Sequence, residues 1–77
     1  MGKQDYDKAI ADFNRALEID PTLAQSYLNR GLALIVKGRE AEAKKDFEMS
    51  VQLNPSLKAE LEPRIDIAKR IRAALRQ

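Results

Sequence analysis

The chain opens with an amphipathic pattern. Between Asp5 and Glu18, apolar residues recur at steps of three and four. Ile19 and then Asp20-Pro21 follow this stretch. These apolar positions cover an arc of about 120°, which is the usual width of the buried stripe of a surface helix. They are Tyr6, Ala9, Ile10, Phe13, Ala16 and Leu17. A residue before proline is pushed out of the helical region, so the pattern predicts a helix that ends near Asp20.

A second pattern, from Thr22 to about Lys37, predicts a helix that must be covered on two sides. Its apolar residues spread over about 200°, roughly twice the width of one buried stripe. Thr22 and Gln25 have the spacing of a capping box at its start, and Gly38 suits the position just beyond its end. Gly31 lies within it and costs about 1 kcal/mol of helix propensity. We therefore expect a close backbone approach there, with Ala43 and Ser50 as its small neighbours.

Two further helices follow. Residues 40–53 carry a narrow buried stripe made of Ala43, Phe47, Ser50 and Val51. Ser56 is placed to cap a last helix that continues towards residue 77. Pro63 lies inside that last pattern and predicts a kink or a short break near Glu62, because proline cannot donate the backbone hydrogen bond and clashes with the preceding turn.

Two of these segments repeat one another. Pro21 and Pro55 are 34 residues apart, and each follows an Ala-x3-Phe pair, Ala9 with Phe13 and Ala43 with Phe47. The second copy has an upstream half as well, which reads Tyr27-x2-Arg30-Gly31-x2-Leu34. Over roughly two thirds of its length the chain resembles the tetratricopeptide repeat family, in which an aromatic residue, glycine, Ala-x3-Phe and proline recur at this period. Arg30 and Leu34 depart from the pattern.

The resemblance implies an all-α fold, an antiparallel α-α superhelix of about four helices in one domain, residues 1–77. Residues 5–20 would be the second helix of a partial repeat, 24–57 a complete repeat, and 58–77 a C-terminal capping helix. The first helix of the partial repeat is missing, because only four residues precede Asp5. The implied function is that of a scaffold or adaptor that binds a protein or peptide partner.

Composition argues against catalysis. The 77 residues include no cysteine and no histidine, so the usual nucleophile, general base and metal ligands are missing, and no cofactor is expected. The formal net charge is only +2, and no apolar run approaches the length of a membrane span. The compartment stays undetermined, with the cytoplasm as the default.

One face of the second helix is the candidate partner-binding groove. In the family, the first helices of successive repeats line a concave surface that holds an extended peptide or a partner's helix. By this resemblance the groove residues are Gln25, Leu28, Asn29, Leu32 and Val36. The alternative is that the fourth helix, or a second chain, covers this face.

Two other surfaces suggest other functions. The stripe of Tyr6, Ala9, Phe13 and Ala16 lacks its upstream cover, which favours a homodimer formed by docking or exchange of helices. The chain start could instead fold back over Phe13. A basic face of Lys69, Arg72 and Arg76 could bind nucleic acid or an anionic surface, although no aromatic residue follows Phe47 to stack on bases. Phosphate binding would weaken steeply with salt, whereas binding in an apolar groove would not.

Overall fold

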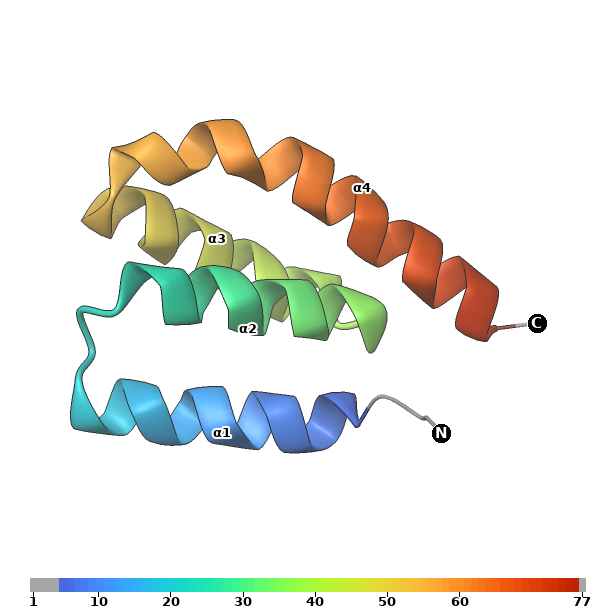
Figure 1. The fold of residues 1–77 in the computed structure, drawn as a ribbon, viewed down its shortest axis with the longest axis horizontal. Coiled ribbons are helices and arrows are strands. Elements are labelled where there is room, and N and C mark those ends of the chain that lie inside the picture. The colour runs from blue at the N-terminus through green and yellow to red at the C-terminus, as the bar shows by residue number, and fades with distance from the viewer. Residues whose placement is uncertain (1–4, 77) are drawn as a thin grey trace.

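The computed structural model describes residues 5–76, and within them the chain forms four α-helices and a short 3-10 helix (Figure 1). In order these are α1 (Tyr6–Ile19), α2 (Ala24–Val36), α3 (Glu40–Leu53), η1 (Pro55–Leu57) and α4 (Lys58–Leu75). Successive α-helices run in opposite directions, and η1 leads directly into α4. The predicted all-α fold of antiparallel helices is confirmed. None of the described helices is long and apolar enough to cross a membrane.

The same turn ends α1 and α3. Asp20 and Asn54, which precede the two prolines, both have extended backbones, with φ of −140° and −144°. The side chain of each accepts two hydrogen bonds from the residue two positions on. Asp20 Oδ1 accepts from the backbone N and Oγ1 of Thr22, and Asn54 Oδ1 accepts from the backbone N and Oγ of Ser56. Such side-chain turns are typical of Asp and Asn, and here they recur with the 34-residue period.

These turns correct two expectations about helix starts. Thr22 forms no capping box, because its hydroxyl is held by Asp20, and α2 begins at Ala24 without a side-chain cap. Ser56 likewise does not cap α4, since its hydroxyl donates to Asn54. The expected helix end at Gly38 is confirmed: its φ of +82° lies in the left-handed region, which glycine enters without strain.

The second helix, α2, is the centre of the packing. It contacts α1, α3 and α4, and α3 lies behind it in the view of Figure 1. Six of its thirteen residues are buried, namely Leu28, Gly31, Ala33, Leu34, Ile35 and Val36. The prediction that α2 is covered on two sides is therefore confirmed.

The close approach at Gly31 involves a different neighbour from the ones predicted. A Cβ atom added to Gly31 would lie 2.5 Å from Cε1 and 2.9 Å from Cδ1 of Phe47. Ala43 and Ser50 are fully buried on the same stripe of α3, yet neither is among the nearest atoms. The ring of Phe47 fills the space that a side chain at position 31 would occupy, so α2 and α3 pack closely through the contact between Gly31 and Phe47.

Pro63 does not break the last helix. Residues Lys58–Leu75 form one continuous helix with Pro63 inside it, so of the two expected alternatives, a kink or a short break, the break does not occur. The ribbon of α4 instead curves over its first half (Figure 1), which is how helices commonly accommodate an internal proline. The curve brings the second half of α4 down towards α2, where Ala68 is buried.

Candidate functional site

A groove with a mainly apolar lining lies where α1, α2 and α4 meet. Its volume is about 570 Å3, and we call it the apolar groove. The lining residues are Tyr6, Ala9 and Phe13 of α1, Asn29, Leu32, Ala33 and Val36 of α2, and Arg64, Ile67, Ala68 and Ile71 of α4. Among these lining residues only Tyr6, Asn29 and Arg64 have polar groups in their side chains. Such a surface suits an apolar protein segment better than a charged small molecule.

The apolar groove joins two surfaces that the sequence suggested separately. Asn29, Leu32 and Val36 were predicted as partner-binding residues of the second helix, and all three line it. Ala9 and Phe13 were predicted as part of a dimer face on the first helix, and they form its opposite wall. Ala9 and Phe13 are half-buried, so each retains surface that a partner could cover.

Three predicted residues lie elsewhere. Leu28, expected to face the groove, is fully buried in the core cluster that also contains Ala68 of α4. Residues of α1, α3 and α4 all belong to that cluster, so Leu28 offers no free surface to a partner. Gln25 is exposed and Ala16 is half-buried, and neither is part of the groove lining.

The wall contributed by α4 was missed as a site. Arg64, Ile67 and Ile71 follow one another at steps of three and four, which places them on one side of the helix. Ile67 and Ile71 give this side of α4 an apolar surface. Nothing in the spacing showed that this face borders the same groove as Phe13.

Comparison with known proteins decides the family. Residues 2–38 match a family model described as a TPR repeat, and residues 24–57 match one described as a tetratricopeptide repeat. The chain belongs to the tetratricopeptide repeat family. Tetratricopeptide repeats generally mediate protein–protein interaction and form a non-catalytic repeat family.

The chain is also similar to a protein whose name states no activity. The chain is 40% identical over 45 residues to an uncharacterized protein of Methanocaldococcus jannaschii, an alignment that covers 58% of this chain and 52% of the relative. The chain thus spans about half the length of this relative. No solved structure matches the chain significantly.

The tetratricopeptide repeat also explains why the groove is open. In the complete repeat, α2 covers the Ala43 and Phe47 stripe of α3, and Phe47 is only 8% exposed. Ala9 and Phe13 are the equivalent residues of α1, 34 positions earlier, and both are only half-buried. Among the described residues, no helix lies against Phe13 in the way that α2 lies against Phe47. Residues 1–4, on which the idea of a folded-back chain start depends, lie outside the described residues.

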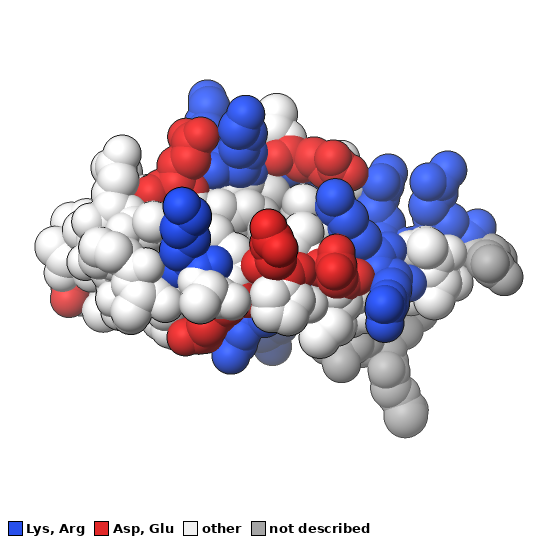
Figure 2. Space-filling model, turned by 90° about the horizontal axis from the view of Figure 1, so that it is seen from above, with Lys and Arg blue, Asp and Glu red and all other residues white. Residues whose placement is uncertain are grey.

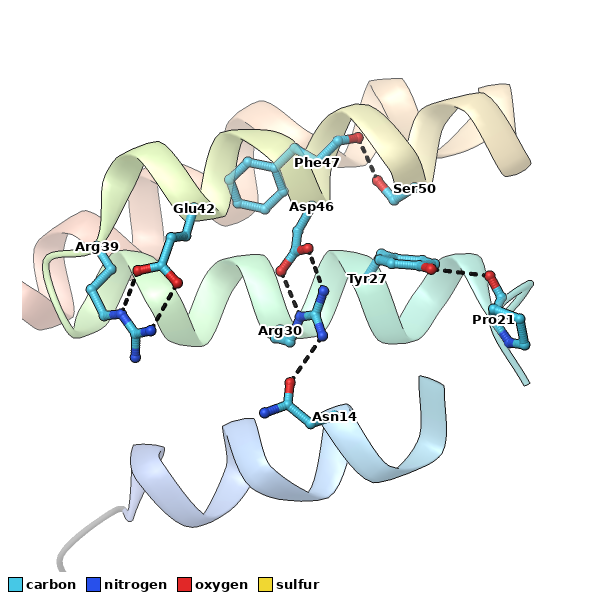
Figure 3. Close-up of polar contacts among 9 residues, drawn as sticks. All are labelled: Asn14, Pro21, Tyr27, Arg30, Arg39, Glu42, Asp46, Phe47 and Ser50. Atoms are coloured by element: carbon cyan, nitrogen blue, oxygen red, sulfur yellow. Dashed lines mark hydrogen bonds and ion pairs between the residues drawn. The ribbon is translucent and has the colours of Figure 1, made fainter. Parts of the chain in front are cut away.

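A polar network on another side of α2 holds three helices together (Figure 3). Arg30 donates two hydrogen bonds to Asp46 of α3, from Nε at 2.8 Å and from Nη2 at 2.7 Å, and a third to Asn14 of α1 at 2.9 Å. The hydrogen bonds that Arg30 donates to Asp46 raise the pKa of Arg30 above its already high ordinary value, so the guanidinium stays charged. The Arg30 guanidinium also lies 5.6 Å from the centre of the Tyr27 ring. By its position in the family pattern Arg30 is only a departure, but in the structure it links α2 to both α1 and α3.

The predicted basic face is partly engaged within the protein. Arg72 lies against Gly38 and pairs with Glu40 of α3 at 3.7 Å, whereas Lys69 and Arg76 are exposed. Figure 2 shows basic side chains gathered at one end of the face seen from above, with acidic side chains next to them. The mixture of signs makes this face a weaker candidate for binding phosphate groups than the sequence alone indicated.

Proposed function

We propose that this chain is a protein-interaction module that binds an apolar helix of a partner in the groove between α1, α2 and α4. The observation that carries the proposal is the contrast between the two repeat copies. Phe47 is buried against α2, while its counterpart Phe13 lies at an apolar groove of about 570 Å3. A helix that occupied the groove would bury Phe13 as α2 buries Phe47.

The shape of the lining supports a helical occupant. The α1 wall offers a small and a large side chain, Ala9 and Phe13. In the complete repeat, the equivalent wall of α3 is covered by a helix, α2, with Gly31 at the point of contact with Phe47. An amphipathic helix laid in a hydrophobic groove contacts it through residues at steps of three and four. We therefore expect the partner segment to carry apolar residues at steps of three and four along one face.

The matching probe can be taken from this chain itself. A synthetic peptide of residues 22–38 contains α2, the helix that packs on the equivalent stripe of α3. Titration of the peptide into labelled protein should shift the amide NMR signals of Phe13, Asn29 and Leu32. Fluorescence anisotropy of a dye-labelled peptide supplies the affinity.

Two variants make the test specific. Phe13→Ser removes groove surface and should weaken peptide binding by about tenfold. Leu53→Ser makes a similar change at an exposed position on α3, outside the groove, and should leave binding unchanged. Binding that is lost equally in both variants, or signals that shift mainly on α3, would show that the groove is not the binding site.

A further inference from the structure

The second half of α4 carries a ridge of uncovered apolar side chains. Ile67, Ile71 and Leu75 are 55%, 36% and 63% exposed, and they follow one another at steps of four residues along the helix. We call these three residues the α4 ridge. Ile67 and Ile71 also line the apolar groove, so ridge and groove form one continuous surface. A continuous row of large exposed apolar residues marks an interaction surface more often than scattered single ones do.

The opposite wall of the groove complements the α4 ridge in shape. Ala9 on α1 leaves room beside Phe13, and both are half-buried. Isoleucine side chains from another helix could pack beside the ring and over the alanine. Within one chain this contact does not form, since both walls retain exposed surface across the groove.

The two walls are complementary in charge as well. Asp12 follows Ala9 by three residues, which places it beside the α1 wall at the outer edge of the groove lining, and it is exposed. Arg64 lines the groove on α4. It contacts Glu60 at 3.3 Å through Nη2, and a guanidinium has five N–H donors, which leaves donors for a second carboxylate. Acidic and basic residues thus edge opposite walls of the same apolar surface.

We propose that the occupant of the apolar groove is a second copy of this chain, an inference that rests on the groove being the binding surface proposed above. A two-fold axis along the groove places α1 of each copy opposite α4 of the other. The α4 ridge then packs on Phe13 and Ala9 of the other copy, and Arg64 meets Asp12. Each contact occurs twice, as in every isologous interface. In Figure 1 α1 and α4 run in opposite directions, so the helices that meet across the interface are antiparallel.

Sedimentation equilibrium of the full chain tests this arrangement. The mass should rise from the 8.7 kDa of one chain towards twice that value as the concentration increases from about 10 to about 500 µM. Ile71→Ser should raise the dissociation constant at least about tenfold. Leu53→Ser, at a similarly exposed position on α3, should leave it unchanged. Circular dichroism checks that both variants stay helical.

A charge exchange identifies the pairing of α1 with α4. Asp12→Lys and Arg64→Glu should each weaken self-association, because each variant brings like charges together at both contacts. An equimolar mixture should restore dimers of mixed composition, in which each altered residue meets an opposite charge in the other chain, and native mass spectrometry would detect them. A mixture that associates no better than its components would refute the pairing.

The outcomes separate this inference from the proposed function. A mass of one chain at every concentration, together with groove binding of the peptide of residues 22–38, removes the dimer and keeps the interaction module. A dimer that Ile71→Ser does not weaken uses another surface, and the inference is then wrong. A chain that is monomeric and also fails to bind the peptide overturns both.

Discussion

The fit between Gly31 and Phe47 makes a definite prediction for the smallest possible change, Gly31→Ala. The new Cβ atom would lie 2.5 Å from Cε1 of the ring and 2.9 Å from Cδ1. Carbon atoms pack best at about 3.5–4.0 Å, so the ring has to retreat by about 1 Å. Phe47 is 8% exposed and lies in the core between α2 and α3, where the displaced ring finds little free space.

Two effects of opposite sign set the magnitude. Alanine is better than glycine inside a helix by about 1 kcal/mol, which would stabilise α2. Overpacking a filled core costs about 1–3 kcal/mol. We expect the second effect to be larger, so that Gly31→Ala lowers the free energy of unfolding by about 1 kcal/mol.

Urea denaturation followed by circular dichroism measures this free energy. Phe47→Leu shortens the side chain, and the alanine should cost less in that background; we expect a coupling of about 1 kcal/mol in the double-mutant cycle. The difference between Gln25→Gly and Gln25→Ala, at an exposed position of the same helix, measures the change in propensity alone. If Gly31→Ala is as stable as the parent, or its cost is the same with leucine at position 47, then the close contact does not limit packing at this site.

Three other predictions follow from the polar contacts and from α4. Because Arg30 and Asp46 form a two-bond pair whose side chains are 23% and 8% exposed, Arg30→Met and Asp46→Asn should each cost about 1–3 kcal/mol; additive losses in the double variant would mean that the pair is not coupled. The hydrogen bond from Arg39 lowers the pKa of Glu42 below its ordinary 4.5, so its contribution to stability is present above that pH and is lost as the pH falls through the folded-state value. In Glu42→Gln the stability should therefore fall slightly less steeply with pH below about 4.5, as measured by acid unfolding followed by circular dichroism. A curve identical to that of the parent would show that the pair of Arg39 and Glu42 adds no stability. Truncation after Pro55 removes the cover of the core and should give a molten product without dispersed amide signals; a sharp, dispersed NMR spectrum of that fragment would show that α4 is dispensable.

The repeat period made the order and direction of the helices predictable. The two prolines fix where α1 and α3 end, because the residue before a proline leaves the helical region at both places. Glycine at position 38 fixes the end of α2 through its positive φ. The apolar surface of α2, about twice as wide as one buried stripe, predicted that the helix lies between other helices. All of these features depend on residues within one helix or one turn, and sequence spacing describes such features well.

Contacts between helices were less predictable, because spacing gives the face of a helix but not the reach of a side chain. Gly31 was matched with Ala43 and Ser50, which share the correct stripe of α3, yet the long ring of Phe47 fills the space. A side chain covers surface away from its own Cα atom, in a direction set by its rotamer. The pair of Arg30 and Asp46, sixteen residues apart, is likewise visible only when the register of α2 against α3 is known.

The repeat predicts two walls of the apolar groove, those on α1 and α2, but not the third wall, on α4. The Phe13 stripe and the Leu32 face had to meet, since both border the position that a further helix would take, just as α2 lies against Phe47 in the complete repeat. The 34-residue offset is enough to place the two faces together, although each carries its own apolar pattern along the chain. Beyond Pro55 no repeat residue remains to fix the rotation of α4. Its orientation follows from the burial of Leu57 and Ala68 and from the curve at Pro63, and this orientation turns Ile67 and Ile71 towards the groove. The wall most open to a partner is therefore the one that the repeat pattern does not describe.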